Sequence, residues 1–396
     1  MNLFSSSLSF VLKHYPVLPT TCLRPQAAIV ASEYFQHSFP GTVLYAVKSN
    51  PRFEILDSIY RSGINHFDVA SISETRLVSS RFPNARLSYM HPVKSRESIC
   101  EAYFEYGVRD FALDSYEELE KIYFSTNNAS DLNLFIRLSV PNDYAKLNLS
   151  NKFGIQLDKA TSLLKSVRAI AQKVGVCFHV GSQCMNPKSF VIAIHRVGDL
   201  IRSSGIMLDI LDVGGGFPSS YIDLNPPPLD TYIEEISGAF MDIPIRDDCE
   251  IWAEPGRALV AEAASTLVRV DHRKDNYLYI NDGIYGSLFD AGLSGFIHPV
   301  QSINIQNKLS NELIPFSFFG PTCDGMDFMK GPYMLPNNIT EGDYIEIGQT
   351  GAYGCTMRTK FNGFYSDEAI FLTDQPIVSL YGQKSGFDQS VNEIAL

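Results

Sequence analysis

The feature that most restricts the fold is a series of eight short runs rich in β-branched and aromatic residues, each followed by room for a helix. Between the runs, stretches such as 53–63 and 155–175 repeat apolar residues at three- and four-residue spacing, which is typical of amphipathic helices. Eight such units predict an α/β fold, a closed (β/α)8 barrel of the TIM type. The runs are 42–48, 65–71, 87–92, 108–115, 133–140, 176–182, 207–216 and 251–257.

Reactive residues stand at or just beyond the C-terminal ends of these runs. Barrels of this type assemble their active sites from the loops at that rim. We therefore expect residues that are distant in sequence to meet at one mouth. The set is Lys48, Asp68, Arg137, His179, Gly214, Gly215, Gly216, Glu254 and Arg257.

After about residue 262 the pattern changes to strands without intervening helices, separated by Gly, Pro and Asn turns. This pattern predicts an antiparallel β domain, a sandwich or barrel, packed closely against a TIM-type barrel that spans 24–262. The predicted strands are 262–270, 276–281, 302–306, 312–319, 343–348, 369–373 and 377–381.

Composition excludes several classes of protein. A net charge of -12 and the absence of any Lys/Arg-rich run argue against nucleic acid as a partner. No run of 18 apolar residues predicts a membrane span, and the N-terminus lacks the features of a secretory signal. The seven cysteines are scattered without a CxxC pair, so we expect a cytoplasmic protein with neither a disulfide framework nor a metal site.

Lys48 ends a strand beside a Ser-Asn-Pro turn. A lysine amine attacks aldehydes when a dry, crowded site lowers its pKa, although most lysines are solvated surface charges. The triple glycine at 214–216 lets the backbone N–H groups approach an anion such as phosphate, and it would equally serve a plain tight turn. Each of these motifs alone is ambiguous.

Glu254 and Arg257 follow on the neighbouring rim. A buried carboxylate keeps a pyridine nitrogen protonated, and a guanidinium binds phosphate bidentately, while the alternative is a structural ion pair. His179 could stack on a cofactor ring and Ser182 could bind phosphate, yet a lone histidine is more often structural.

Cys323 and Asp324 lie together in a glycine-flanked loop of the second domain. A thiol is a suitable proton donor to a carbanion, and a carboxylate can bind an amine. Free cysteines are more often inert core residues, and the other six are interpreted in that way.

Together these motifs resemble fold type III pyridoxal-phosphate decarboxylases, in the branch of the ornithine decarboxylases. The resemblance covers about residues 24–365. The motifs occur in the order YAVKSNP, FDVAS with Glu74 beyond it, NKFG, HVGS, DVGGGFP, AEPGR, GPTCDG, GAY and FNGF.

The resemblance implies that Lys48 holds pyridoxal 5'-phosphate as a Schiff base. It also implies that His179 stacks on the ring, that Glu254 pairs with the ring nitrogen, and that Asp68 and Arg137, with Glu74 behind them, position the lysine and the cofactor. Ser182, Gly216, Arg257 and Tyr353 would hold the phosphate, and Gly214, Gly215 and Gly256 are further cofactor-binding residues.

On the substrate side, the resemblance implies that Cys323 protonates Cα and that Asp324 faces the distal amine. Tyr285 and Phe361 would border the substrate. The Cys-Asp loop and Phe361 enter the partner's active site in that family, which implies a homodimer with shared sites. The family's N-terminal segment returns to the β domain, so that domain is expected to comprise 1–23 and 263–396.

The expected substrate is a small basic amino acid, L-ornithine first, giving putrescine for polyamine biosynthesis. Diaminopimelate decarboxylases bind a distal carboxylate with arginine, and no arginine lies between Arg273 and Arg358. The ornithine enzymes usually carry a second acid nine positions after the Tyr285 equivalent, where this chain has Ser294. Asp290 is the only acid nearby and is the candidate for binding the substrate in its place. L-lysine or another diamino or modified amino acid therefore stays open.

Two other classes of protein are weighed against a decarboxylase. An inactive binding or regulatory relative would be expected to lack the lysine or the cysteine, and both are present. A racemase with the same cofactor fits poorly with the CDG loop and the FNGF segment. Carbon dioxide release, compared with interconversion of enantiomers, separates these possibilities.

Overall fold

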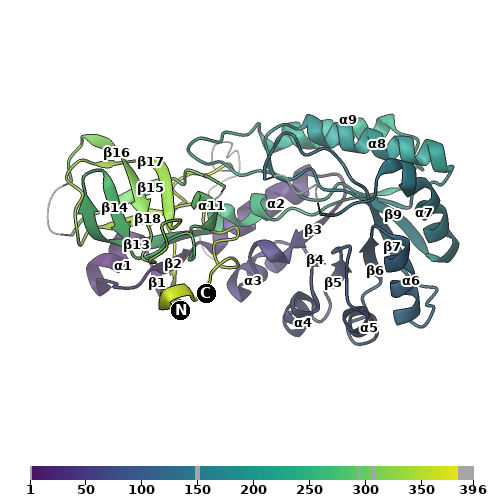
Figure 1. Ribbon diagram of the computed structural model, residues 1–396, viewed down its shortest axis with the longest axis horizontal. Coiled ribbons are helices and arrows are strands. Elements are labelled where there is room, and N and C mark those ends of the chain that lie inside the picture. The colour runs from purple at the N-terminus through teal and green to yellow at the C-terminus, as the bar shows by residue number, and fades with distance from the viewer. Residues whose placement is uncertain (1, 148–151, 293, 306–308, 382–396) are drawn as a thin grey trace.

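The computed structural model describes residues 2–147, 152–292, 294–305 and 309–381. Asn151 of the NKFG motif and Gln306 of a predicted strand lie outside these ranges. The molecule is elongated, with the barrel at one end and the β domain at the other (Figure 1). No helix in the described part of the chain is long and apolar enough to cross a membrane.

Eight parallel strands close into a barrel in the order β11-β12-β3-β4-β5-β6-β7-β9. Each predicted run overlaps one of them, β9 only at residues 176 and 177, and the predicted fold class is confirmed. Their bounds are β3 Thr42–Ala46, β4 His66–Val69, β5 Arg86–Tyr89, β6 Asp110–Leu113, β7 Asn133–Arg137, β9 Lys173–Cys177, β11 Ile210–Asp212 and β12 Glu250–Ala253.

Helices cover the outside of the barrel (Figure 1). In α4, α5 and α6 the side chain of a serine at the N-cap accepts the backbone N–H three residues on, so the sequence itself fixes where each helix starts. The bounds are α2 Pro25–Ser38, α3 Phe53–Arg61, α4 Ile72–Arg81, α5 Arg96–Phe104, α6 Tyr116–Ser125, α7 Leu157–Ile170, α8 Lys188–Ser204 and α9 Leu229–Asp242.

The barrel interior is filled by an apolar plug. Its members come from strands all round the barrel, and Trp252 is the largest. The fit is close, since a Cβ on Gly175 would lie 2.3 Å from Cδ1 of Phe135. The plug forms a dry floor beneath the C-terminal rim. It consists of Leu44, Met90, Ala112, Phe135, Cys177, Ile210 and Trp252.

A buried polar cluster lies near the strand starts, on the other side of this plug. Asp110 accepts two hydrogen bonds from Arg86, both 2.9 Å, and one from the Ser88 hydroxyl at 3.0 Å. His66 Nε2 lies 2.7 Å from the same hydroxyl. Polar residues at this end of a barrel serve stability rather than catalysis.

We expect this cluster to make the folded chain sensitive to acid. Burial lowers the pKa of His66 to about 3, against 6.5 for an ordinary histidine. Below pH 6.5 the unfolded chain therefore binds a proton that the folded chain does not, and the free energy of unfolding falls with pH by at most about 1.4 kcal/mol per unit. Denaturant titrations across this range should show a steeper loss of stability for the wild type than for His66→Gln. Equal slopes would contradict the assignment.

The β domain is a nine-stranded sheet, and it is mixed rather than wholly antiparallel. The pairs β1–β19, β2–β19 and β14–β16 are parallel. These partners are far apart in the chain, so no hairpin dictates their direction. The strands are β1 Leu3–Phe4, β2 Thr20–Leu23, β13 Ala264–Lys274, β14 Tyr277–Ile280, β15 Val300–Ile303, β16 Leu313–Phe319, β17 Phe328–Pro336, β18 Tyr344–Ile347 and β19 Ala369–Leu372.

Two details of this sheet differ from the sequence prediction. Strand β17 was not predicted, because Gly331 and Pro332 interrupt its apolar pattern. The run 377–381 is not a strand. It is held instead by the buried Glu262 of η2 (Ala261–Ala263), which accepts hydrogen bonds from the Ser379 hydroxyl and the Leu380 N–H, each at 2.5 Å.

The chain passes between the two ends of the molecule at two places that lie side by side. It enters the barrel after β2 and leaves it through η2 into β13, and β2 and β13 pair with Leu23 opposite Ala264. The Arg24 guanidinium binds Glu346 of β18 at 2.7 Å and the Ser265 hydroxyl at 2.8 Å, both buried. The N-terminal strands therefore belong to the same sheet as the C-terminal ones.

Candidate active site at the barrel rim

Lys48 lies at the rim, in the 3-10 turn η1 (Val47–Ser49) that follows β3. Its ammonium binds the Asp68 carboxylate at 2.6 Å, and its side chain is 39% exposed toward the mouth while Asp68 is buried. Burial opposes the charge on Lys48, but the carboxylates of Asp68 and Glu254 outweigh it and raise its pKa above the usual range. The nearby carboxylates therefore outweigh the lowering of the pKa that a dry, crowded site alone would produce.

The residues around this pair hold it in place. Asp68 lies in β4, and Glu74 fixes the turn after this strand by accepting the Ala70 N–H at 2.6 Å. Burial raises the pKa of Glu74. Arg137 is half-buried at the end of β7. With Lys48, its charge adds to burial in lowering the pKa of His179 well below the usual value.

His179 is a neutral imidazole of defined tautomer. The Gly181 N–H donates to its Nδ1 at 2.9 Å, so the ring proton is assigned to Nε2. The ring lies against the triple glycine, since a Cβ on Gly215 would be 3.1 Å from Nε2. A flat face at this position is suited to stacking on an aromatic cofactor.

The triple glycine forms a close cradle between the ends of β9 and β12. Gly214 has φ +67° and Gly216 has φ +106°, a region that side chains rarely adopt. A Cβ on Gly214 would lie 1.9 Å from the Phe178 carbonyl oxygen. Ser182 begins β10 (Ser182–Cys184) next to this cradle, and the Cys184 N–H binds the Gly216 carbonyl at 2.9 Å.

Arg257 is buried beside the cradle at the start of α10 (Arg257–Val260). Its Nη1 donates to the Tyr221 hydroxyl and to Asp290, each at 2.7 Å. Its guanidinium lies 5.0 Å from the Tyr353 ring centre. Two further donors, Nε and Nη2, are buried and have no partner among the described residues. Unpaired buried donors of this kind call for an anion.

The structure corrects the expectation for Asp290. This residue lies in α11 (Phe289–Gly292), and its carboxylate is engaged by Arg257 in a buried ion pair at 2.7 Å. A carboxylate neutralised in this way is not free to bind a substrate ammonium. Its role is to fix the guanidinium, so the candidate substrate-binding residues are reduced by one acid.

Glu254 follows β12 and is buried, with Oε1 lacking a hydrogen-bond partner among the described groups. Its backbone N–H binds the Gly214 carbonyl at 2.9 Å, which locks its position against the cradle. Gly256 brings this loop against the lysine turn, since a Cβ there would be 3.0 Å from Cβ of Ser49. The Tyr353 N–H also binds the Ser49 carbonyl, at 2.8 Å.

The Cys-Asp loop lies on the β domain. Cys323 is exposed, and its N–H binds the Asn362 side chain at 3.1 Å. The Tyr285 hydroxyl donates to Asp324, and the Tyr285 and Phe361 ring centres are 5.0 Å apart. The Met326 N–H and the Tyr285 hydroxyl lower the pKa of Asp324. No hydrogen bond or ion pair within the described chain links this loop to Lys48, His179 or Glu254.

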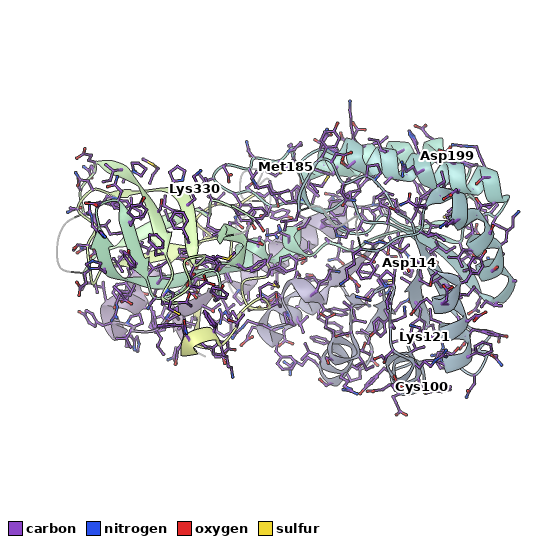
Figure 2. The ribbon with its side chains drawn as sticks, viewed as in Figure 1. Cys100, Asp114, Lys121, Met185, Asp199 and Lys330 are labelled. Atoms are coloured by element: carbon purple, nitrogen blue, oxygen red, sulfur yellow. The ribbon has the colours of Figure 1, made fainter. Side chains whose placement is uncertain are left out.

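Two of the other cysteines, Cys100 and Cys177, lie on elements of the barrel. Cys100 is exposed on α5, on the outer surface of the barrel (Figure 2). Cys177 belongs to the apolar plug, and burial raises the pKa of its thiol well above the ordinary value. Cys100 is therefore remote from the rim, whereas Cys177 is a buried thiol in the layer beneath it.

Two residues of the rim were missed by sequence reasoning. Tyr221 lies in an irregular stretch without a motif, and only the fold brings its hydroxyl to Arg257. Asp212 is fully buried beside Glu254 and stands two residues before the triple glycine. That spacing was a usable signal, because a carboxylate at the end of a barrel strand points to the active-site rim.

These groups fit pyridoxal phosphate. The cradle and the two unpaired Arg257 donors match a phosphate, Glu254 matches a pyridine nitrogen, and the Lys48 amine matches an aldehyde. When bound, this cofactor supplies an electron sink for carbanion chemistry at the substrate Cα.

The comparisons agree with that fit. Residues 28–261 match the family model described as pyridoxal-dependent decarboxylase, pyridoxal binding domain. The chain is 31% identical over 348 residues to the lysine/ornithine decarboxylase of Selenomonas ruminantium, which covers 84% of each protein.

Two solved structures extend the likeness. The lysine/ornithine decarboxylase from Vibrio vulnificus complexed with putrescine has a TM-score of 0.78 and 28% identity, covering 93% of this chain and 99% of that one. The arginine decarboxylase of Paramecium bursaria Chlorella virus bound to agmatine has a TM-score of 0.81 and 26% identity, covering 92% and 98%.

Proposed function

Since the chain belongs to the family of pyridoxal-dependent decarboxylases, we propose that it releases the α-carboxylate of a diamino acid as carbon dioxide, with L-ornithine as substrate and putrescine as product. Decarboxylases named for ornithine, lysine and arginine are similar to this chain at 26–32% sequence identity. The substrate is therefore argued from this chain's own residues.

The observation that carries the proposal is the Asp324 carboxylate. It is ionised, it is held by the Tyr285 hydroxyl and the Met326 N–H, and it stands next to the Cys323 thiol. An anion beside a proton donor is suited to a substrate with a positive distal group. No arginine between 273 and 358 offers itself to a distal carboxylate.

Under this proposal each rim residue has a defined task. Lys48 would hold the cofactor covalently, His179 would lie against its ring, and Glu254 would accept a hydrogen bond from the ring nitrogen. Cys323 donates the proton that replaces the carboxylate on Cα, so the product is the amine. Ser182, Gly216, Arg257 and Tyr353 would hold the phosphate, and Gly214, Gly215 and Gly256 would line the rest of the cofactor site.

A substrate panel read by carbon dioxide release tests the proposal. The panel is L-ornithine, L-lysine, L-arginine and meso-diaminopimelate, each compared by kcat/KM with saturating cofactor. We expect ornithine to lead, with lysine next because it differs by one methylene, a difference of about 1–3 kcal/mol in a pocket. Preference for diaminopimelate, or racemisation without carbon dioxide release, would contradict the proposal.

Replacing Asp324 by alanine should raise KM for ornithine by about tenfold to a hundredfold, because a charged hydrogen bond worth about 1.5–3 kcal/mol is lost. Asp324→Asn keeps the shape and the Tyr285 contact, so it separates charge from packing. Steady-state kinetics with ornithine and with norvaline, which lacks the distal amine, provide the measurement. An unchanged KM for ornithine in the alanine variant would remove Asp324 from substrate binding.

We further propose a homodimer in which the Cys-Asp loop of one subunit completes the barrel site of the other. Supporting this, Cys323 is exposed, Phe361 and Met326 are 42% and 58% exposed, and the lysine lies on the other part of the chain. In this arrangement the barrel spans 24–262 and the β domain comprises 1–23 and 263–396. Seven unpaired cysteines favour the cytoplasm as its compartment.

Mixing two inactive variants tests the shared site. Lys48→Ala and Cys323→Ala subunits, combined in equal amounts and allowed to exchange, should recover about a quarter of wild-type activity, because half of the dimers contain one intact site of two. Each variant alone is the control. No recovery, despite exchange seen by light scattering or tagged pull-down, would place both residues in one subunit's site.

A further inference from the structure

A second buried carboxyl group stands behind Glu254. Asp212 ends β11, and Glu254 follows the neighbouring strand β12. The Val213 N–H binds the Trp252 carbonyl and the Glu254 N–H binds the Gly214 carbonyl, both at 2.9 Å, so these two strand ends are held in register.

The register sends both carboxyl groups into the barrel. Ile210 and Trp252 belong to the apolar plug, and alternate residues of a strand point to the same side. Asp212 and Glu254, each two positions further on, therefore form the next layer above that plug. Their exposed fractions are 0% and 3%, and they lie within hydrogen-bond reach of each other.

The hydrogen bonds of this pair are incomplete unless it carries a proton. Oδ1 of Asp212 accepts the Gly214 N–H at 2.7 Å. Oδ2 of Asp212 and Oε1 of Glu254 are buried and have no partner among the described groups. Two adjacent carboxylates in a dry site do not both stay ionised, and a single shared proton satisfies both oxygens.

Burial and the negative charges around the pair favour the same state, and the two nearby positive charges oppose it. Burial raises the pKa of Asp212 to about 6 and, with the negative charges of Asp212 and Asp68, raises that of Glu254. Lys48 lowers the pKa of Glu254, and Arg137 lowers that of Asp212. The Cys177 thiol also lies near the pair and stays neutral, because burial raises its pKa.

We infer that Asp212 is a positioning residue that shares one proton with Glu254 and, when the cofactor is bound, holds that proton and donates a hydrogen bond to the Glu254 carboxylate. This rests on the proposed contact of Glu254 with the ring nitrogen. The proton moves only within the pair, from Glu254 to Asp212, so no charge enters or leaves. Glu254 then offers its other oxygen, negatively charged and fixed in direction, to the ring N–H.

Asparagine and alanine variants at position 212 test whether Asp212 acts as a protonated hydrogen-bond donor or as a negatively charged group. Asn Oδ1 can accept the Gly214 N–H and its amide can donate to Glu254, so Asp212→Asn reproduces the protonated side chain without a negative charge. Asp212→Ala provides neither group. We expect Asp212→Ala to weaken pyridoxal phosphate binding and to lower kcat, each at least about tenfold, and Asp212→Asn to recover most of both.

Two readouts do not depend on turnover. Titration of each variant with pyridoxal phosphate gives Kd and the pH dependence of the bound cofactor's visible band. This pH dependence should differ from that of the wild type in Asp212→Ala and match it in Asp212→Asn. The cofactor-free Asp212→Asn chain should also unfold at a higher temperature than the wild type at alkaline pH. The pKa of the wild-type pair is raised by folding, so its contribution to stability is lost as pH rises through that pKa.

An asparagine variant as impaired as the alanine variant would overturn the inference, since the group would then act as an anion. An alanine variant equal to the wild type in affinity and band position would overturn it as well. Glu254→Gln is the reference. If this variant too leaves the band and Kd unchanged, the proposed ring-nitrogen contact fails and not only the role of Asp212.

Discussion

Lys48→Ala is expected to lower carbon dioxide release from ornithine at least about a thousandfold at saturating cofactor, because it removes the amine that is proposed to form the covalent bond with the cofactor aldehyde. Borohydride treatment followed by peptide mapping provides a second measurement. The wild type should carry the reduced cofactor on the peptide that contains residue 48, and the variant should carry none.

The control concerns Asp68, a buried carboxylate that loses its ion-pair partner in this variant. Lys48 pairs with Asp68 at 2.6 Å, so its removal leaves Asp68 without a counter-charge. The double variant Lys48→Ala/Asp68→Asn removes that unpaired charge and should match the wild type more closely in thermal unfolding while staying inactive. Full turnover by Lys48→Ala would end the proposed mechanism.

Arg257→Met is expected to weaken pyridoxal phosphate binding at least about a hundredfold, because two buried donors without other partners would bind the phosphate. Pyridoxal, which lacks the phosphate, separates this contact from all others. Its Kd should differ little between variant and wild type. Absorbance titrations with both compounds give the ratio of the Kd for pyridoxal to the Kd for pyridoxal phosphate in each variant.

A loss of stability accompanies that change and needs its own control. Arg257 neutralises Asp290 inside the protein, and breaking a buried ion pair from one side costs about 3–5 kcal/mol. The double variant Arg257→Met/Asp290→Asn should recover stability without recovering phosphate affinity. If Arg257→Met still prefers pyridoxal phosphate to pyridoxal as strongly as the wild type does, the phosphate lies elsewhere.

The barrel could be predicted from the sequence because its information is local. Each strand run is short and apolar, and amphipathic helices follow, in several cases after a serine cap. The parallel arrangement then brings Lys48, Asp68 and Glu254 to one rim, although more than two hundred residues separate the first from the last.

What the sequence could not supply depends on contacts between distant segments. The pKa of Lys48 rises because Asp68 and Glu254 face it, whereas burial alone would lower it. Asp290 lies in a helix of four residues, and only the packing of the two ends of the molecule turns it toward Arg257. Strand β17 carries Gly331 and Pro332, which local propensity assigns to a turn.

The paired crossings of the chain have a mechanical consequence. A tilt of one end of the molecule against the other would shear the ladder between β2 and β13 and pull Arg24 from its buried partners. Because the two connections are paired with each other, they restrict rotation of one end against the other more than a single connection would. The spacing between the lysine and the Cys-Asp loop of one chain is thus set when the chain folds. We expect ligand binding to cause little hinge motion between the two ends of the molecule.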